Sequence, residues 1–449
     1  MDDRESVRLT SLDAFRGLTM LLLVPDVLGG FSFYEMARQN PDSALWTTLA
    51  RVFSHAQWSG ASVWDFIMPA FVFMIGLSMP YSHAARMRAG HSQANIVAHA
   101  ALRAAAFLIL GILFLLPDAT ALDFVWPLVL LSLGLPVPAL LARLFDREGK
   151  RGVDFFEWLW WGIVLGVSAV HVAMEVPYAP NFYLHDILTQ VGMGYLAAFL
   201  LVGRSRRIQG IAIALILAGY WLAFLLYPLP SDDFPLSVVG VLPGDERFTG
   251  LFAHWNKGTN LVRAFDVWFL NLFPRPQPFV FNTHGYGTLN VILMTASMIF
   301  GVMTGEFVRG RRERSEVRNG LFAGSAALLI AGLVAGWLVC PIVKSIWTPS
   351  WVLFSSGGVL LAFALLYELI DVRGYQRWTF PLVVAGRNPL ILYTLAEHYR
   401  WWVLAPWRHT FGRLFAQTRG APVLDALACL LTLWTFAWLL YRQRVFLRI

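Results

Sequence analysis

Apolar runs of about 20 residues recur from one end of this 449-residue chain to the other. Each run is long enough to cross a lipid bilayer as an α-helix. Inside lipid, only helices and closed barrels satisfy every backbone hydrogen bond. Hydrophobic residues make up 57% of the chain and charged residues only 14%, well below the share in a typical soluble domain. The sequence therefore predicts an all-α, polytopic membrane protein.

We expect about twelve transmembrane helices, separated by prolines, glycines and clusters of charge. Pro127, Pro136 and Pro138 interrupt the fourth, which is the least regular of them. The expected helices cover 12–30, 62–80, 98–116, 123–143, 156–176, 186–203, 208–228, 287–307, 318–339, 349–371, 380–398 and 423–442.

The distribution of arginine and lysine predicts the orientation. Short cytoplasmic loops of membrane proteins carry an excess of these residues. With twelve helices, every basic cluster falls on one side, including 204–207, 309–318 and 442–448. Both termini are therefore expected in the cytoplasm. The net charge of +7 is explained by the membrane, and no nucleic-acid partner is expected.

Three long segments lie on the opposite side and are rich in Trp, His and Asn: 31–61, 229–286 and 399–422. Within 252–274, an apolar face recurs at helical spacing through Leu261, Phe265, Trp268 and Leu272. This pattern predicts a helix that lies in the membrane interface. The alternative is an ordinary belt of aromatic residues with solvated loops.

Most of the remaining sequence features exclude a kind of segment or site. The N-terminal stretch MDDRESVRLT is acidic and polar, so we expect no cleavable signal and a first helix that is retained. Cys340 and Cys429 lie far apart in apolar stretches, which indicates neither a disulfide nor a metal site. The sequence contains no P-loop, GxSxG, HExxH or paired-cysteine motif.

Polar residues inside the expected helices are the strongest sign of function. Ionisable groups in a membrane usually face a bundle interior or an aqueous cavity. Asp13 and Arg16, three residues apart, are expected simply to pair on one helix face. The others are candidates for function: Asp26, Asp65, Gln190, Asn290, Lys344, Arg387 and Asn388.

His55 and Asp65 lie in the stretch SHAQWSGASVWDFIMPAFVFMIG at 54–76. Histidine is the side chain best suited to accept a proton near neutral pH. Asp65 follows ten residues later and could orient the imidazole or a substrate if the loop folds back. A hydrogen-bonded histidine of the aromatic belt is the alternative, and the spacing alone leaves both readings open.

The segments SLDAFRGLTM at 11–20 and SHAQWSGASVWDFIMPAFVFMIG closely resemble the start of the heparan-α-glucosaminide N-acetyltransferase family. The resemblance continues in DILTQVGMGYL at 186–196, GYGTLNVILM at 285–294 and KSIWTPSWVLFSS at 344–356. It ends with DVRGYQRW at 371–378, AGRNPLILY at 385–393 and LLYRQRVFLRI at the C-terminus. Residues 118–178 have no obvious counterpart and are expected to be an inserted helical pair.

This resemblance implies transfer of acetyl from cytosolic acetyl-CoA to an amino sugar or another glycan acceptor on the far side of the membrane. It implies that His55 is catalytic, and we expect Asp65 and Asp26 to complete the catalytic set. Asp26 stands where the family commonly has an Asn, which leaves the acceptor open. Residues expected to bind acetyl-CoA are Gln190, Asn290, Lys344, Trp347, Arg387 and Asn388. Those expected to bind the acceptor are Trp58, Trp255 and Asn256.

The complete prediction is a single acyltransferase domain, 1–449, in a bacterial-type cytoplasmic membrane. No metal is expected, and the prediction is compatible with a homodimer. Its large extracytoplasmic loop is 229–286. A secondary transporter of a small polar or sugar solute is the alternative, because twelve helices with both ends inside also suit that class. Many transporters show internal repeats, which this sequence lacks.

Overall fold

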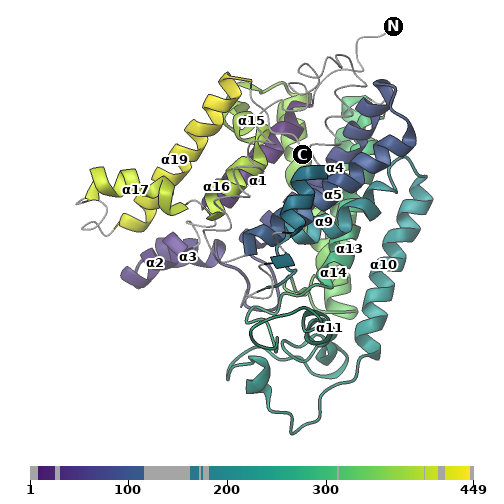
Figure 1. The fold of residues 1–449 in the computed structure, drawn as a ribbon, viewed down its shortest axis with the longest axis vertical. Coiled ribbons are helices and arrows are strands. Elements are labelled where there is room, and N and C mark those ends of the chain that lie inside the picture. Colours follow the sequence, from purple (N-terminus) through teal and green to yellow (C-terminus); the bar gives the residue numbers. More distant parts are fainter. Residues whose placement is uncertain are drawn as a thin grey trace. The chain divides into compact units, whose positions relative to one another are not determined.

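The computed structural model describes residues 9–25, 31–115, 162–170, 173–174, 182–310, 313–398, 400–412 and 420–444. Every regular element within these ranges is a helix, as predicted (Figure 1). Seven of the described helical segments are long and apolar enough to cross a bilayer. They are Trp64–Arg88, Gln93–Leu113, Arg206–Leu226, Asn290–Arg309, Arg314–Leu338, Pro349–Val372 and Ala421–Arg442. The chain is a multi-pass membrane protein by this measure.

The chain divides into two compact units, described separately below. The first unit comprises 1–75, 307–336 and 353–447. The second comprises 76–306 and 337–352, together with the last two residues.

In the first unit, α1 (Thr10–Pro25) packs against two short helices, α15 (Phe380–Arg387) and α16 (Pro389–His398). The α1–α15 crossing is close because Gly17 faces the Leu382 backbone and Gly386 faces the Asp13 backbone. Small residues of this kind allow helix backbones to approach each other in membranes. The remaining elements are α2 (Phe31–Gln39), α3 (Ala44–Val52), η3 (Trp64–Phe66), η7 (Glu368–Val372), η8 (Arg377–Thr379), α17 (Arg400–Thr410), α19 (Ala421–Arg442) and parts of α4 (Ile67–Arg88), α13 (Arg314–Leu338) and α14 (Pro349–Tyr367).

In the second unit, α5 (Gln93–Leu115) packs along α9 (Ile187–Phe199), again through glycines. Gly192 lies against the backbone of Leu108, and Gly111 lies against that of Thr189. The unit also contains α10 (Arg206–Leu226) and most of α12 (Asn290–Arg309). The segment 229–286, called the cap below, carries η5 (Leu236–Val239), η6 (Gly250–Trp255) and α11 (Leu261–Leu270).

Several expected boundaries change in the structure. The predicted single helix 380–398 is instead two helices, because Asn388 leaves the helical conformation (φ −132°, ψ 55°) immediately before Pro389. Proline disfavours the helical region for the residue before it, which accounts for the break. The expected helix 123–143 lies outside the described residues, as do parts of 156–176 and much of the proposed insertion 118–178. The total of twelve and the orientation remain predictions.

The interfacial helix predicted in 252–274 is shorter than its pattern suggested. It begins at Leu261, where the side chain of Asn260 caps it by accepting a hydrogen bond from the Arg263 amide at 3.2 Å. Trp268 and Leu272, on the predicted apolar face, are about 60% exposed. The buried face carries Val262, Asp266 and Leu270 instead.

Candidate functional site

The loop between α3 and η3 folds back so that His55 meets Asp65. His55 Nδ1 lies 2.8 Å from Asp65 Oδ1. The His55 side chain is 46% exposed, whereas that of Asp65 is 1% exposed. The contact that the sequence left open is therefore present in the structure, and it pairs a buried carboxylate with an accessible imidazole.

Backbone groups hold Asp65 in this position. Its second oxygen, Oδ2, accepts hydrogen bonds from the amides of Ala56 at 3.1 Å and Ser62 at 2.9 Å. The Ser62 hydroxyl in turn accepts from the amides of Trp64 and Asp65, which begins the helical turn η3. Asp65 thus lies at the start of a helix, where the helix dipole favours a negative charge.

This arrangement fixes the tautomer of His55. An ionised carboxylate can only accept hydrogen bonds, so Nδ1 carries the hydrogen and Nε2 carries the lone pair. A histidine oriented by a buried aspartate is the usual construction of a general base. Chemically, the pair can accept a proton at Nε2 and stabilise the resulting imidazolium.

Trp58 and Asp26, two other predicted site residues, are less informative. Trp58 is 3% exposed and is therefore a core residue in this structure. Asp26 lies outside the described residues. Their predicted roles remain predictions.

Arg387 and Asn388 lie at the break between α15 and α16. The Arg387 Nε atom is 4.0 Å from Asp13 Oδ2, and its guanidinium lies over the Tyr441 ring at 5.9 Å. Asp13 also pairs with Arg16 at 3.6 Å, which confirms the ion pair predicted from their spacing. Asn388 is 1% exposed. The break therefore holds a cation near Asp13 of α1 and a buried amide at the next residue.

In the second unit, Gln190 and Asn290 hold loop backbone near the start of α9 and α12. Gln190 Nε2 donates to the carbonyls of Leu184 and Thr288, and Asn290 Nδ2 donates to that of Ser345 at 2.8 Å. The amide oxygens of both side chains are buried without a hydrogen-bond partner. Buried polar atoms of this kind are rare and call for an explanation, such as a water or a ligand.

Lys344 and Trp347 belong to the buried turn between α13 and α14. Trp347 is fully buried and adopts φ +48°, a conformation that costs free energy in a bulky residue. Its indole lies 3.4 Å from the hydroxyl of Ser297, and Tyr220 donates to the neighbouring Ile346 carbonyl at 3.0 Å. Lys344 is 6% exposed. Sequence reasoning missed Tyr220 and Ser297, since a hydroxyl inside an apolar helix gives no pattern of its own.

Trp255 and Asn256 are buried in the cap and have structural contacts. Trp255 stacks on Phe224 with ring centroids 5.8 Å apart. Asn256 bonds both the amide and the carbonyl of Phe248, at 2.7 and 2.9 Å. These contacts stabilise the cap, and a role in acceptor binding remains a prediction.

Near the start of α1, a network of charged and polar groups joins three helices of the first unit. The Ser11 amide donates to Asp371 at 3.2 Å, and Arg314 donates to the Asp371 carbonyl at 2.6 Å. Arg318 and Arg373 both pair with Glu368. Asp371 and Glu368 lie in the π-helical turn η7, a feature that no sequence pattern indicated. Among the described residues, no group of three or more His, Cys, Asp or Glu side chains could hold a metal ion.

Comparison with known proteins finds distant relatives of this chain. No family model matches the chain. The human heparan-alpha-glucosaminide N-acetyltransferase is 24% identical over 98% of this chain and 60% of the human protein. The mouse protein of the same name is 23% identical over 86% of this chain and 53% of its own length.

The chain is a distant relative of these acetyltransferases. It spans about three fifths or less of the length of the curated relatives it matches. The resemblance found in the sequence motifs is thereby confirmed. Both relatives are named as acetyltransferases, and the activity of this chain is a matter for proposal.

Proposed function

We propose that the protein transfers acetyl from cytosolic acetyl-CoA to the amino group of a sugar acceptor on the extracytoplasmic side of the membrane. The contact between His55 and Asp65 is the observation that carries this proposal. The names of the relatives, which specify N-acetyltransfer to a glucosaminide, support the choice of reaction.

In the proposed reaction, the acceptor nitrogen attacks the thioester carbonyl carbon of acetyl-CoA. His55 Nε2 takes the proton from that nitrogen, the carbon–sulfur bond breaks, and the proton passes to the departing CoA thiolate. Asp65 holds the imidazole and stabilises its charged form. An acetyl-histidine intermediate is a second route with the same residues. General-base catalysis of this kind contributes about 10²–10⁴-fold to a rate.

Arginines on the predicted cytoplasmic side would hold the CoA phosphates, since the guanidinium fork matches phosphate geometry. Arg318 and Arg373 already pair with Glu368, so they are poor candidates. Arg204 and Arg207 are exposed and are better ones. The buried amides Gln190, Asn290 and Asn388 are proposed to meet the acyl arm.

The test is a transfer assay with purified protein, [¹⁴C]acetyl-CoA and glucosamine. We expect labelled N-acetylglucosamine and a stoichiometric release of free CoA. If the protein instead takes up solute into proteoliposomes without CoA, the transporter alternative is correct. Absence of both acetyl transfer and thioester hydrolysis would contradict the proposed enzyme.

A further inference from the structure

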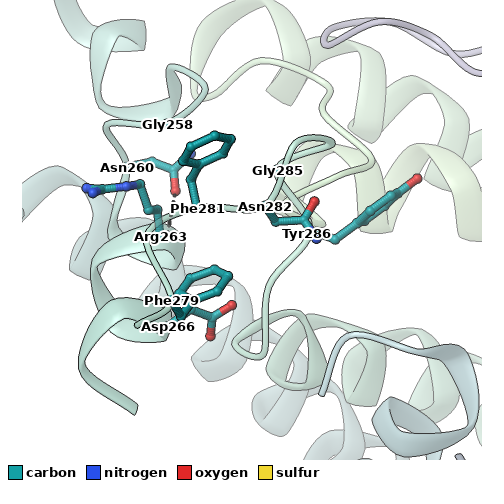
Figure 2. Close-up of a pocket in the computed structure, with 9 residues that line it drawn as sticks. All are labelled: Gly258, Asn260, Arg263, Asp266, Phe279, Phe281, Asn282, Gly285 and Tyr286. Carbon is teal, nitrogen blue, oxygen red and sulfur yellow. Dashed lines mark hydrogen bonds between the residues drawn. The ribbon is translucent and has the colours of Figure 1, made fainter. Parts of the chain in front are cut away.

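The cap of the second unit contains a small hollow of about 10 Å³ (Figure 2). This is roughly the room that one water molecule needs. A primary ammonium group is of similar size. Its walls include one acidic and one basic side chain, Asp266 and Arg263, together with the aromatic rings of Phe279, Phe281 and Tyr286.

Asp266 presents a buried carboxylate to this hollow. The residue is 3% exposed, and both carboxylate oxygens accept from the Thr288 amide at 3.1 Å. No ion pair joins Asp266 to any cation of the described residues. Burial raises the pKa of this carboxyl to about 6. The side chain is therefore an anion, near neutral pH, whose charge is not compensated.

Arg263 does not supply the missing cation, although it lies three residues earlier on α11. Its Nε donates to the Val280 carbonyl at 2.9 Å. Figure 2 shows the Arg263 guanidinium and the Asp266 carboxylate turned in different directions. The other nearby side chains with a titratable group, Tyr220 of α10 and Tyr286, are phenols and cannot supply a positive charge.

The aromatic walls suit the same kind of ligand. A cation near the face of a Phe or Tyr ring is attracted by the ring quadrupole. Tyr286 is fixed by stacking on His185, with ring centroids 5.9 Å apart and the planes 8° from parallel. Asn282 adds a side-chain amide at the rim, whose oxygen accepts from the His284 amide at 2.8 Å.

We propose that this hollow is a binding site for a primary ammonium group, and that its physiological occupant is the amine of the acceptor sugar. The second half of this statement rests on the proposed acetyl transfer. The hollow fits only the ammonium group, so the sugar ring would lie outside it, against the exposed rim. The uncompensated carboxylate favours an amine over a hydroxyl acceptor. An amine held here as an ammonium has no lone pair, so it must leave the hollow and lose a proton before its nitrogen attacks the thioester. The neutral amide that acetylation produces would not be attracted back.

The test measures binding in the absence of acetyl-CoA, by calorimetry on the purified full-length protein. At pH 7.5, glucosamine should bind at least about tenfold more tightly than glucose or N-acetylglucosamine. Asp266→Asn should remove that preference, because the amide keeps the shape and loses the charge. Asp245→Asn is the matched control: this carboxylate also lies in the cap but already pairs with Lys257 at 3.2 Å. The Asp245→Asn variant should bind glucosamine as tightly as the wild-type protein does.

Two further measurements on the wild-type protein need no variant. Methylammonium should compete with glucosamine for the site. Affinity for glucosamine should fall about tenfold between pH 7.5 and 5, because the Asp266 carboxyl, with a pKa of about 6, becomes protonated. Equal binding of the three sugars, or no competition by methylammonium, would overturn the proposal even if Asp266→Asn fails to fold.

The outcomes separate this site from the proposed reaction. Selective glucosamine binding without any acetyl transfer would leave the site standing and contradict the proposed function. Unchanged transfer by Asp266→Asn at low glucosamine would contradict the site and leave the function standing.

Discussion

At the residue level, the hydrogen bonds around Asp65 decide which nitrogen of His55 can act as a base. One carboxylate oxygen meets Nδ1 of His55, and the other accepts from two backbone amides. The amides of Ala56 and Ser62 both donate, so they require an oxygen atom at the position of Oδ2. Any replacement at residue 65 must therefore keep an oxygen there and present its remaining atom to the imidazole.

Asp65→Asn should for this reason lose much of the activity. The amide oxygen will face the amides of Ala56 and Ser62, so the NH₂ group will face His55. Nδ1 must then accept, the hydrogen moves to Nε2, and the base is lost. We expect turnover to fall about 10²–10⁴-fold with little change in the acetyl-CoA dissociation constant. Near-normal turnover of Asp65→Asn would contradict this explanation. So would an Asp65→Glu variant that is active although it has lost the hydrogen bonds from the Ala56 and Ser62 amides.

At the level of elements, the crossing of α1 and α15 tolerates no side chain. A Cβ atom on Gly17 would overlap the Leu382 carbonyl oxygen, and one on Gly386 would overlap that of Asp13. Gly17→Ala or Gly386→Ala should cost about 1–3 kcal/mol, the usual penalty for overpacking. Thermal unfolding in detergent measures this loss of stability. The control is Gly219→Ala in α10, where nothing lies within 4 Å and the unfolding temperature should hold or rise.

The cap and His185, which stacks on Tyr286 of the cap, should show two opposing responses to acid. Burial and the nearby His284 lower the pKa of His185 to about 4, below its ordinary 6.5. This stability contribution is present above pH 6.5 and is lost as the pH falls toward 4. The pKa of Asp266 is raised to about 6 from 3.8, so its contribution grows as the pH falls through 6.

The two residues therefore compensate each other between pH 6 and 4. Hydrogen exchange of peptides covering 182–186 and 279–288 should change little over this range in the wild-type protein. His185→Gln should gain protection on acidification, and Asp266→Asn should lose it. The same pH response in both variants would show that the two side chains do not carry the effect.

At the level of the whole molecule, the predicted orientation puts the cap and the arginine clusters on opposite sides of the membrane. Ser231 of the cap and Arg204 are both exposed, whereas Cys340 and Cys429 are buried. An impermeant maleimide should label Ser231→Cys in intact cells and should label Arg204→Cys only after lysis. The reverse pattern would invert the predicted orientation.

Local sequence patterns explain which parts of this fold the sequence could predict. Apolar runs identify membrane helices, and the spacing of Asp13 and Arg16 identifies their pair, because both features are local. The break at Asn388 was missed, although Pro389 provides the reason for it. The contact between His55 and Asp65 depends on how a loop closes, and the hollow at Asp266 depends on segments up to 28 residues apart along the cap. No local pattern encodes such contacts.

The central claim is that His55 is the base of an acetyl transfer. The most direct measurement is the turnover of purified His55→Ala with acetyl-CoA and glucosamine, beside His409→Ala, an exposed histidine of the same unit. Both variants should fold and bind acetyl-CoA. We predict that His55→Ala loses about 10²–10⁴-fold in turnover, whereas His409→Ala keeps the wild-type rate. Near-normal turnover of a folded His55→Ala protein would contradict catalysis by His55. It would indicate instead that His55 is a hydrogen-bonded histidine of the aromatic belt.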